Sequence, residues 1–294
     1  MTPALSRRLL PYALIAPAVA LCALVLLYPL GQALRISLFR KVLGFPERFI
    51  GPANFVDIFS DAQFLNSLVV TLWWTVGSVL GQLVIGFGLA VLLNRQFPGR
   101  ALFRTLFLLP WVLPNFIAAL TWVWMLNDRF GIVPALLARA HLVDERVLFL
   151  ATPSLTLPTV IAVNVWKNYA FVMIVMLAAL QAIPGEVYEA ARVDGASRWQ
   201  SFTAITLPLV KPMLFIVVLL RLIWTFNTFE LVFIMTEGGP GRSTEILTIT
   251  AFLQAFRGGV MGYGAAIGVI LFVLTLVFAL TYVRLQGQAL RGEV

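Results

Sequence analysis

Charged residues are scarce in this sequence. Asp, Glu, Lys and Arg together make up 12% of its 294 residues, while hydrophobic residues make up 61%. A soluble domain has about 25% charged and about 45–50% apolar residues, so a soluble fold of this size could not cover so much apolar surface. The same composition excludes an intrinsically disordered chain. The class that remains is an integral membrane protein.

Cysteine and histidine are almost absent. Cys22 is the single cysteine, so no disulfide can form within the chain. His141 is the single histidine, and a solvated loop histidine is far more expected there than a metal ligand or a base. The patterns HExxH, GxSxG, CxxC and GxxxxGKS/T do not occur. We therefore expect no catalytic residue, no metal site and no cofactor on this chain.

Acidic residues are fewer than basic ones, 13 against 21. A basic balance can indicate a nucleic-acid partner, but Lys and Arg at the flanks of membrane spans explain it more simply. We expect membrane lipid around this chain, and no nucleic acid.

Long uncharged runs follow one another along the chain. A helix needs about 20 apolar residues to cross the hydrocarbon core, and the strands of a membrane barrel would be much shorter. The first run is longer than the apolar region of a signal peptide, so we interpret it as a retained span. We predict an all-α, polytopic protein with a single transmembrane domain over 1–294. Its six predicted spans are 9–34, 67–93, 104–126, 156–180, 212–235 and 262–284.

Two of the spans contain glycine pairs with GxxxG spacing. These are Gly77 with Gly81 and Gly264 with Gly268. Small residues four apart let helix backbones approach closely in lipid. We favour packing within the chain over a contact between subunits.

Basic residues give a weak signal of orientation. Counted over all the loops, Lys and Arg divide almost evenly between the two sides of the membrane. Arg7, Arg8 and the tight 94–104 loop, which contains three arginines and no acid, favour a cytoplasmic position. We predict that both termini are cytoplasmic.

The segment 181–211 is too polar to span a membrane. Glu186–Val193 is rich in helix formers, and Asp194-Gly195 then marks a turn. Ser197 and Gln200 have the spacing of a capping box, which starts a second helix. We expect Leu207-Pro208 and Pro212 to end that helix. Such a helix–turn–helix could dock another protein or could serve only its own bundle, and these residues alone leave both open.

The same segment resembles the EAA loop of ABC-transporter permeases. Glu189-Ala190-Ala191 is followed after three residues by Gly195, and then after nine more by Ile205-Thr206-Leu207-Pro208. The resemblance implies a type I importer permease whose loop is a coupling helix that docks on a cytoplasmic ATPase. It also implies that the loop faces the cytoplasm. The implied ATPase-coupling residues are Glu189, Ala190, Ala191, Asp194, Gly195, Ala196, Leu207 and Pro208.

A second resemblance covers nearly the whole chain and narrows the class. Phe226–Phe229, Thr236–Pro240 and Met261–Ala266 are similar to segments of sugar permeases of the maltose and glycerol-3-phosphate type. It implies a second permease subunit, two ATPase subunits that bind ATP and Mg, and an external solute-binding protein. The substrate would be a di- or monosaccharide, a polyol or glycerol-3-phosphate, and the location the inner membrane of a bacterium.

Polar side chains lie inside two predicted spans, where they usually face a bundle interior or a cavity. Asn164, Lys167 and Asn168 share one helical face with Phe171, and amides with aromatic rings suit a sugar. The resemblance implies that most of this set lines the substrate path, although Lys167, Thr225 and Thr228 depart from the maltose type. These groups could instead bridge subunits or anchor helices. The predicted lining is Asn164, Lys167, Asn168, Phe171, Trp224, Thr225, Asn227, Thr228 and Glu230.

Arg221 and Glu230 are too far apart on one helix to pair with each other. Arg221 could meet a carbonyl or a partner subunit, and Glu230 could point toward substrate or toward Lys167. These charges leave a rival interpretation, a secondary transporter coupled to an ion gradient. An intramembrane enzyme is a weaker alternative, because no constellation of nucleophile, base or metal ligands is evident. The EAA loop argues against both.

Overall fold

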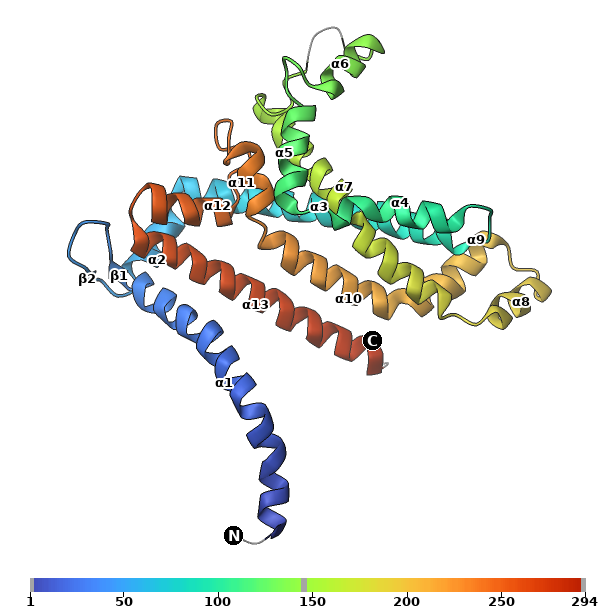
Figure 1. The fold of residues 1–294 in the computed structure, drawn as a ribbon, viewed down its shortest axis with the longest axis horizontal. Coiled ribbons are helices and arrows are strands. Elements are labelled where there is room, and N and C mark those ends of the chain that lie inside the picture. The colour runs from blue at the N-terminus through green and yellow to red at the C-terminus, as the bar shows by residue number, and fades with distance from the viewer. Residues whose placement is uncertain (1–2, 144–146, 292–294) are drawn as a thin grey trace. The chain divides into compact units, whose positions relative to one another are not determined.

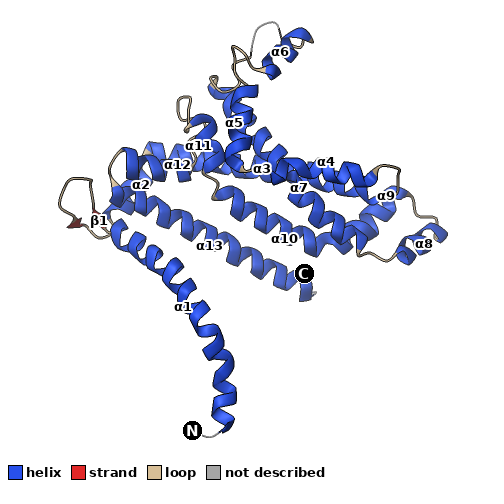
Figure 2. Ribbon diagram, viewed as in Figure 1, coloured by secondary structure: helices blue, strands red, loops and turns tan. Residues whose placement is uncertain are grey.

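The computed structural model describes residues 3–143 and 147–291. They are mostly helical, and the described strands are two short ones, so the all-α prediction is confirmed (Figure 2). The chain divides into two compact units, one of 1–64 with 250–272 and one of 65–249 with 273–294. The single transmembrane domain over 1–294 stays a prediction.

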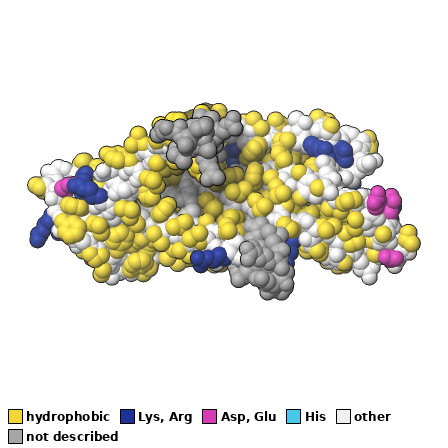
Figure 3. Space-filling view, turned by 90° about the horizontal axis from the view of Figure 1, so that it is seen from below, with side chains coloured by type: hydrophobic (Ala, Val, Ile, Leu, Met, Phe, Trp, Pro, Cys, Tyr) yellow, Lys and Arg dark blue, Asp and Glu magenta, His cyan; other side chains and the backbone are white. Residues whose placement is uncertain are grey.

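Five described helices are long and apolar enough to cross a membrane, or six if one bent helix pair counts as a span. Four of them agree closely with the predicted ranges (Figure 1). In the most apolar stretch of the first helix no residue is buried. Hydrophobic side chains also cover much of the face shown in Figure 3. Lipid would solvate such surface. These four helices are α1 (Pro3–Ser37), α3 (Ala62–Asn94), α7 (Pro153–Gln181) and α13 (Met261–Arg291).

The predicted span 104–126 is not one straight helix. It is divided between α4 (Arg100–Val112) and α5 (Asn115–Met125), whose axes differ by 94°. Leu113 between them is extended, with φ −61° and ψ 137°. Pro114 explains the break, because its ring disfavours helical backbone at the preceding residue and it has no N–H to donate.

The predicted span 212–235 also differs from the helices that form. A continuous helical segment contains α9 (Arg198–Ser201), the π-helical turn η1 (Phe202–Thr206) and α10 (Leu207–Phe226). The expectation that Leu207-Pro208 and Pro212 end the helix is therefore wrong. Pro208 and Pro212 both lie inside this continuous segment, and Pro208 comes two residues after the π-helical turn. The helix ends instead at Asn227, and a separate helix, α11 (Glu230–Thr236), follows.

In the first unit, the end of α1 leads into an antiparallel pair of strands, β1 (Phe39–Arg40) and β2 (Arg48–Phe49), with Phe39 opposite Phe49. The helix α2 (Ala53–Ser60) holds this turn in place. Its Asn54 side-chain amide donates to the carbonyl of Ser37 at 2.7 Å and to that of Phe39 at 3.1 Å. A β-carbon at Gly262 would lie 2.1 Å from the Phe39 carbonyl oxygen, so only glycine fits there.

In the second unit, α3 packs closely on α7. β-carbons at Gly77 and Gly81 would lie 3.1 Å from Ile161 and 2.6 Å from Val165, so the first GxxxG pair serves packing within the chain, as predicted. A buried core cluster that includes Met173 and Met176 continues this contact.

The remaining described helices of the two units are short. They are α6 (Ile132–Arg139), α8 (Gly185–Val193), α12 (Leu247–Phe252) and the π-turn η2 (Leu253–Arg257).

Candidate functional site

Lys167 lies in the middle of α7 and is 4% exposed. Its ammonium donates to the backbone carbonyl of Trp111 at 2.9 Å. Trp111 is in the last turn of α4, where carbonyls have no partner within their own helix. The break at Leu113-Pro114 therefore supplies the acceptor for this buried cation.

Arg221 on α10 is also 4% exposed. Its Nε donates to Oε1 of Gln82 on α3 at 2.6 Å, and its guanidinium lies 5.6 Å from the centre of the Trp224 ring. Among the described residues, no ion pair includes Lys167 or Arg221. Both cations are therefore held by uncharged groups. For Arg221 the sequence left open a carbonyl or a partner subunit, and the group found is the side-chain amide oxygen of Gln82.

A chain of amide groups extends from Arg221 into α7. Nε2 of Gln82 donates to the Asn164 carbonyl at 3.4 Å, and Nδ2 of Asn168 donates to Oδ1 of Asn164 at 2.8 Å. Asn164 is 3% exposed, and its own Nδ2 has no hydrogen-bond partner among the described residues. Three helices are tied together by these polar contacts, which a lipid environment strengthens because water does not compete.

Aromatic rings lie next to this chain. The Trp111 and Phe171 rings are 6.3 Å apart, and the Phe171 and Trp224 rings meet edge to face at 5.0 Å. Trp224 is 47% exposed, so this row ends at an open surface. Rings of this kind can cover the C–H face of a sugar.

The other predicted lining residues are less closely grouped. Thr225 is buried and its carbonyl accepts from Nε1 of Trp74 at 3.0 Å. Thr228 donates to the Trp224 carbonyl at 3.0 Å, whereas Asn227 donates to Oγ1 of Thr275 on α13 at 3.2 Å. Glu230 is exposed in the first turn of α11, and the hydrogen bond of Lys167 goes to Trp111 instead.

Residues of α3 were missing from the predicted set. Gln82 is the one amide in the predicted span 67–93, and Ser78 and Thr75 precede it on the same helical face. The hydroxyl oxygens of Ser78 and Thr75 are buried, and in the part of the chain that the structure describes neither has a hydrogen-bond partner. The spacing of these three residues indicates a polar face on α3. It does not identify the partner of Gln82, because Arg221 is 139 residues away in the sequence.

The polar loop forms the predicted helix–turn–helix. Gly195 between α8 and α9 has φ +78°, a left-handed backbone that favours glycine. The capping box is confirmed, since Ser197 accepts from the Gln200 N–H at 3.3 Å and Oε1 of Gln200 accepts from the Ser197 N–H at 2.8 Å. Ala191 is buried against the turn, where its carbonyl accepts from the Ala196 N–H at 2.9 Å.

The outer side of this loop is open. Val193 is 87% exposed, and the side chain of Glu189 is 69% exposed beside Arg192, at 3.7 Å. Ala190 and Asp194 are exposed as well. Leu207 and Pro208 lie farther on, in the first turn of α10. The loop presents an ordered, mixed apolar and acidic surface of the kind that a partner protein can cover.

Comparison with known proteins decides the family. Residues 82–289, which include the amide chain and the loop, match the model of the family described as the binding-protein-dependent transport system inner membrane component. The chain belongs to this family. It is a permease component of a binding-protein-dependent ABC transport system.

Similar permeases cover the chain almost completely. The trehalose/maltose transport system permease protein MalF of Thermococcus litoralis is 35% identical over 94% of this chain and 92% of its own length. The structure of a bacterial ABC transporter that imports the acidic polysaccharide alginate superposes with a TM-score of 0.84, at 28% identity, over 96% of each chain. The same transporter in complex with an alginate pentasaccharide-bound periplasmic protein gives a TM-score of 0.80, at 28% identity, over 94% and 93%.

Proposed function

We propose that this chain forms half of the translocation pathway of an ATP-driven importer for a sugar or sugar-like solute. The observation on which this rests is the near-complete match to permeases whose names state trehalose/maltose and alginate transport. The aromatic row that ends at Trp224 and the amides beside it agree with a hydroxyl-rich substrate.

The accessible residues would make the first contact with substrate. Trp224 is exposed, while Asn168, Phe171 and Thr228 are half-buried. Asn164, Lys167 and Thr225 are buried in this conformation. We propose that the accessible group contacts sugar directly and that the buried group holds the helices at the spacing that the substrate path needs.

The helix–turn–helix would couple transport to ATP. Its exposed surface around Glu189, Val193 and Asp194 would sit on a cytoplasmic ATPase. With six spans, a cytoplasmic loop at this point of the chain would put both termini in the cytoplasm. ATP and Mg would bind to that partner, and the permease itself would have no enzymatic role. When the two ATPase copies close, they would draw the loops together and open the path outward.

The complete importer would contain three further kinds of subunit. A second permease would complete the pathway, two ATPase subunits would bind below it, and an external solute-binding protein would deliver the sugar. The periplasmic protein in the alginate transporter complex supports the last of these. We place the assembly in the cytoplasmic membrane of a bacterium.

Affinity purification of the tagged full-length chain in mild detergent tests this proposal. We expect an ATPase with a phosphate-binding loop and a second permease to copurify, and uptake of a labelled sugar to stop when ATP is depleted. If the chain purifies alone and uptake resists ATP depletion but collapses with an uncoupler, the rival ion-coupled transporter is the better interpretation. Lys167 and Glu230 would then be the first residues to test.

A further inference from the structure

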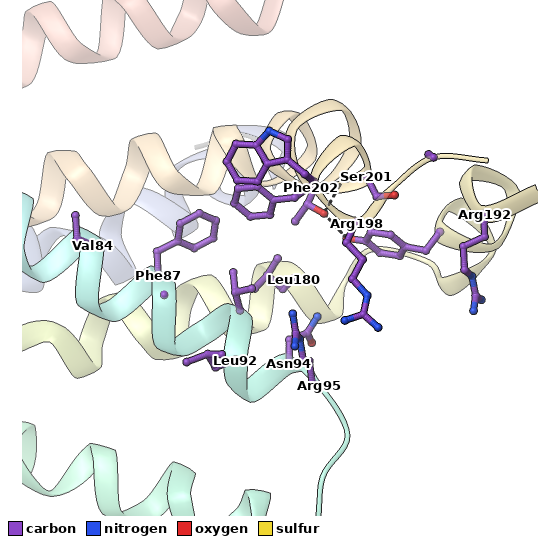
Figure 4. A pocket seen from close by; sticks show the side chains of 16 residues that line it. Val84, Phe87, Leu92, Asn94, Arg95, Leu180, Arg192, Arg198, Ser201 and Phe202 are labelled. Carbon is purple, nitrogen blue, oxygen red and sulfur yellow. Dashed lines mark hydrogen bonds between the residues drawn. The ribbon is translucent and has the colours of Figure 1, made fainter. Parts of the chain in front are cut away.

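The docking loop is the helix–turn–helix formed by α8 and α9 (185–201). A groove of about 1170 Å³ lies between α3 and this loop, together with the π-turn η1 that follows it. Figure 4 shows side chains from the end of α3, from α7 and from the α9 region directed toward this space. All of the lining residues belong to the second compact unit. They are Val84, Phe87, Gly88, Val91, Leu92, Asn94, Arg95, Leu180, Tyr188, Arg192, Ala196, Arg198, Trp199, Ser201, Phe202 and Thr206.

One part of the groove is apolar. Val84, Phe87 and Val91 follow one face of α3, and the Phe87 ring lies 6.0 Å from the ring of Phe202. Gly88 lies on the same stretch, and a β-carbon there would meet nothing within 4 Å. The apolar wall is therefore open along the helix, with room beside it.

The other part of the groove is basic. Arg95 and Arg198 are exposed, and no described ion pair includes either of them. Arg192 also lines the groove but pairs with Glu189 at 3.7 Å. The lining includes no acidic residue. Two unpaired guanidinium groups at one end of an apolar channel favour an anion that has an apolar tail.

The dimensions fit one membrane leaflet. Val84 and Asn94 are ten residues apart on α3, which corresponds to about 15 Å of helix rise, and Arg95 follows directly after the helix. Half of a hydrocarbon core of about 30 Å is about 15 Å. Trp199, which is 71% exposed at the basic end, is a residue type that gathers at the membrane–water boundary.

We propose that this groove binds an acidic phospholipid. Its phosphate would lie between Arg95 and Arg198, and an acyl chain would follow Val84, Phe87 and Val91 past Gly88. Basic pockets between transmembrane helices at the cytoplasmic side suit such headgroups. The lipid would touch α9 and η1, so its presence would help to fix the position of the docking loop.

Lipid titration of the purified full-length chain, followed by native mass spectrometry, tests this. The probes are phosphatidylglycerol and phosphatidylethanolamine with identical acyl chains. Arg95→Gln with Arg198→Gln removes the charges. Arg100→Gln is the control, because Arg100 lies nearby at the start of α4 but does not line the groove. Gly88→Leu fills the channel, and Gly31→Leu on α1 is its control, since space there is also open.

We expect wild type to bind phosphatidylglycerol more tightly than phosphatidylethanolamine. Each basic residue near an acidic lipid contributes about 1 kcal/mol, so the double variant should bind phosphatidylglycerol about 30-fold more weakly. Gly88→Leu should weaken binding of phosphatidylglycerol, and both controls should bind as wild type does. Arg95→Lys with Arg198→Lys should restore the preference, which separates charge from folding.

Three results would overturn the proposal. These are equal affinity for the two lipids in wild type, an Arg95→Gln/Arg198→Gln variant that binds phosphatidylglycerol normally, and unchanged binding in Gly88→Leu. Competition by inorganic phosphate at concentrations similar to those of the lipid would also count against it. The site would then recognise the phosphate alone, without the acyl chain.

Discussion

Replacement of Gln82 by leucine tests the buried amide chain most directly. Gln82 accepts from Nε of Arg221 at 2.6 Å and donates to the Asn164 carbonyl at 3.4 Å. It is fully buried, and Arg221 is 4% exposed. Leucine has a similar volume, so the substitution removes polar contacts and leaves the packing of α3 almost unchanged. The guanidinium would then lose the one hydrogen bond described for its Nε.

The expected loss of unfolding free energy follows from the charge. A neutral hydrogen bond between membrane helices contributes about 0.6 kcal/mol on average, whereas one to a charged group contributes about 1.5–3 kcal/mol. A buried charge left without any partner costs about 3–5 kcal/mol. Because Arg221 keeps its contact with the Trp224 ring, 5.6 Å from its guanidinium, we expect a destabilisation of about 2 kcal/mol.

Unfolding in mixed micelles with increasing SDS, followed by tryptophan fluorescence, measures this loss. Gln181→Leu is the matched control, because Gln181 is exposed at the end of α7. Arg221→Met combined with Gln82→Leu should recover most of the stability, with an interaction energy of at least about 1 kcal/mol in the double-mutant cycle. A Gln82→Leu variant as stable as Gln181→Leu, or a cycle with zero interaction energy, would refute the reasoning.

Three further predictions concern packing, docking and substrate. Gly81→Leu should lower stability by about 1–3 kcal/mol, because its β-carbon would lie 2.6 Å from Val165, whereas Gly268→Leu, in open space, should leave the melting temperature unchanged. Glu189→Lys should reach the membrane in normal amounts yet abolish sugar uptake, and normal uptake would remove the docking role. Trp224→Ala should raise the KM for uptake severalfold without loss of copurifying subunits, and an unchanged KM would place Trp224 outside the substrate path.

Local signals in the sequence predicted the docking loop well. Ser197 and Gln200 form the capping box that their spacing indicates, and Gly195 takes the left-handed turn that Asp194-Gly195 suggests. Each of these features depends on residues a few positions apart, so the sequence contains all of the information needed. The GxxxG spacing of Gly77 and Gly81 predicted a close helix contact within the chain for the same reason, but it did not indicate that the partner helix is α7.

Features that depend on distant residues were not predicted. Charge spacing identified Arg221 as an intramembrane cation, but nothing local indicated Gln82 as its partner. Pro114 itself is a sequence signal for the break between α4 and α5. The uncharged run around it nevertheless predicted one straight span, because hydropathy measures polarity and not backbone conformation. Pro208 and Pro212 predict the end of a helix, yet the helix that starts at Arg198 continues through both of them, with a π-helical turn just before Pro208.

That continuation has a mechanical consequence. From Arg198 to Phe226 the backbone is helical without a break, about 43 Å at the usual rise per residue. A rod of this kind transmits displacement along its length, whereas a flexible connector would absorb it. Movement of the turn at Gly195 would therefore reach Trp224 as a tilt of the whole rod about its contacts with α7. The π-turn at Phe202–Thr206 is the place where the rod can twist, since such turns hold their hydrogen bonds in a wider, looser ring.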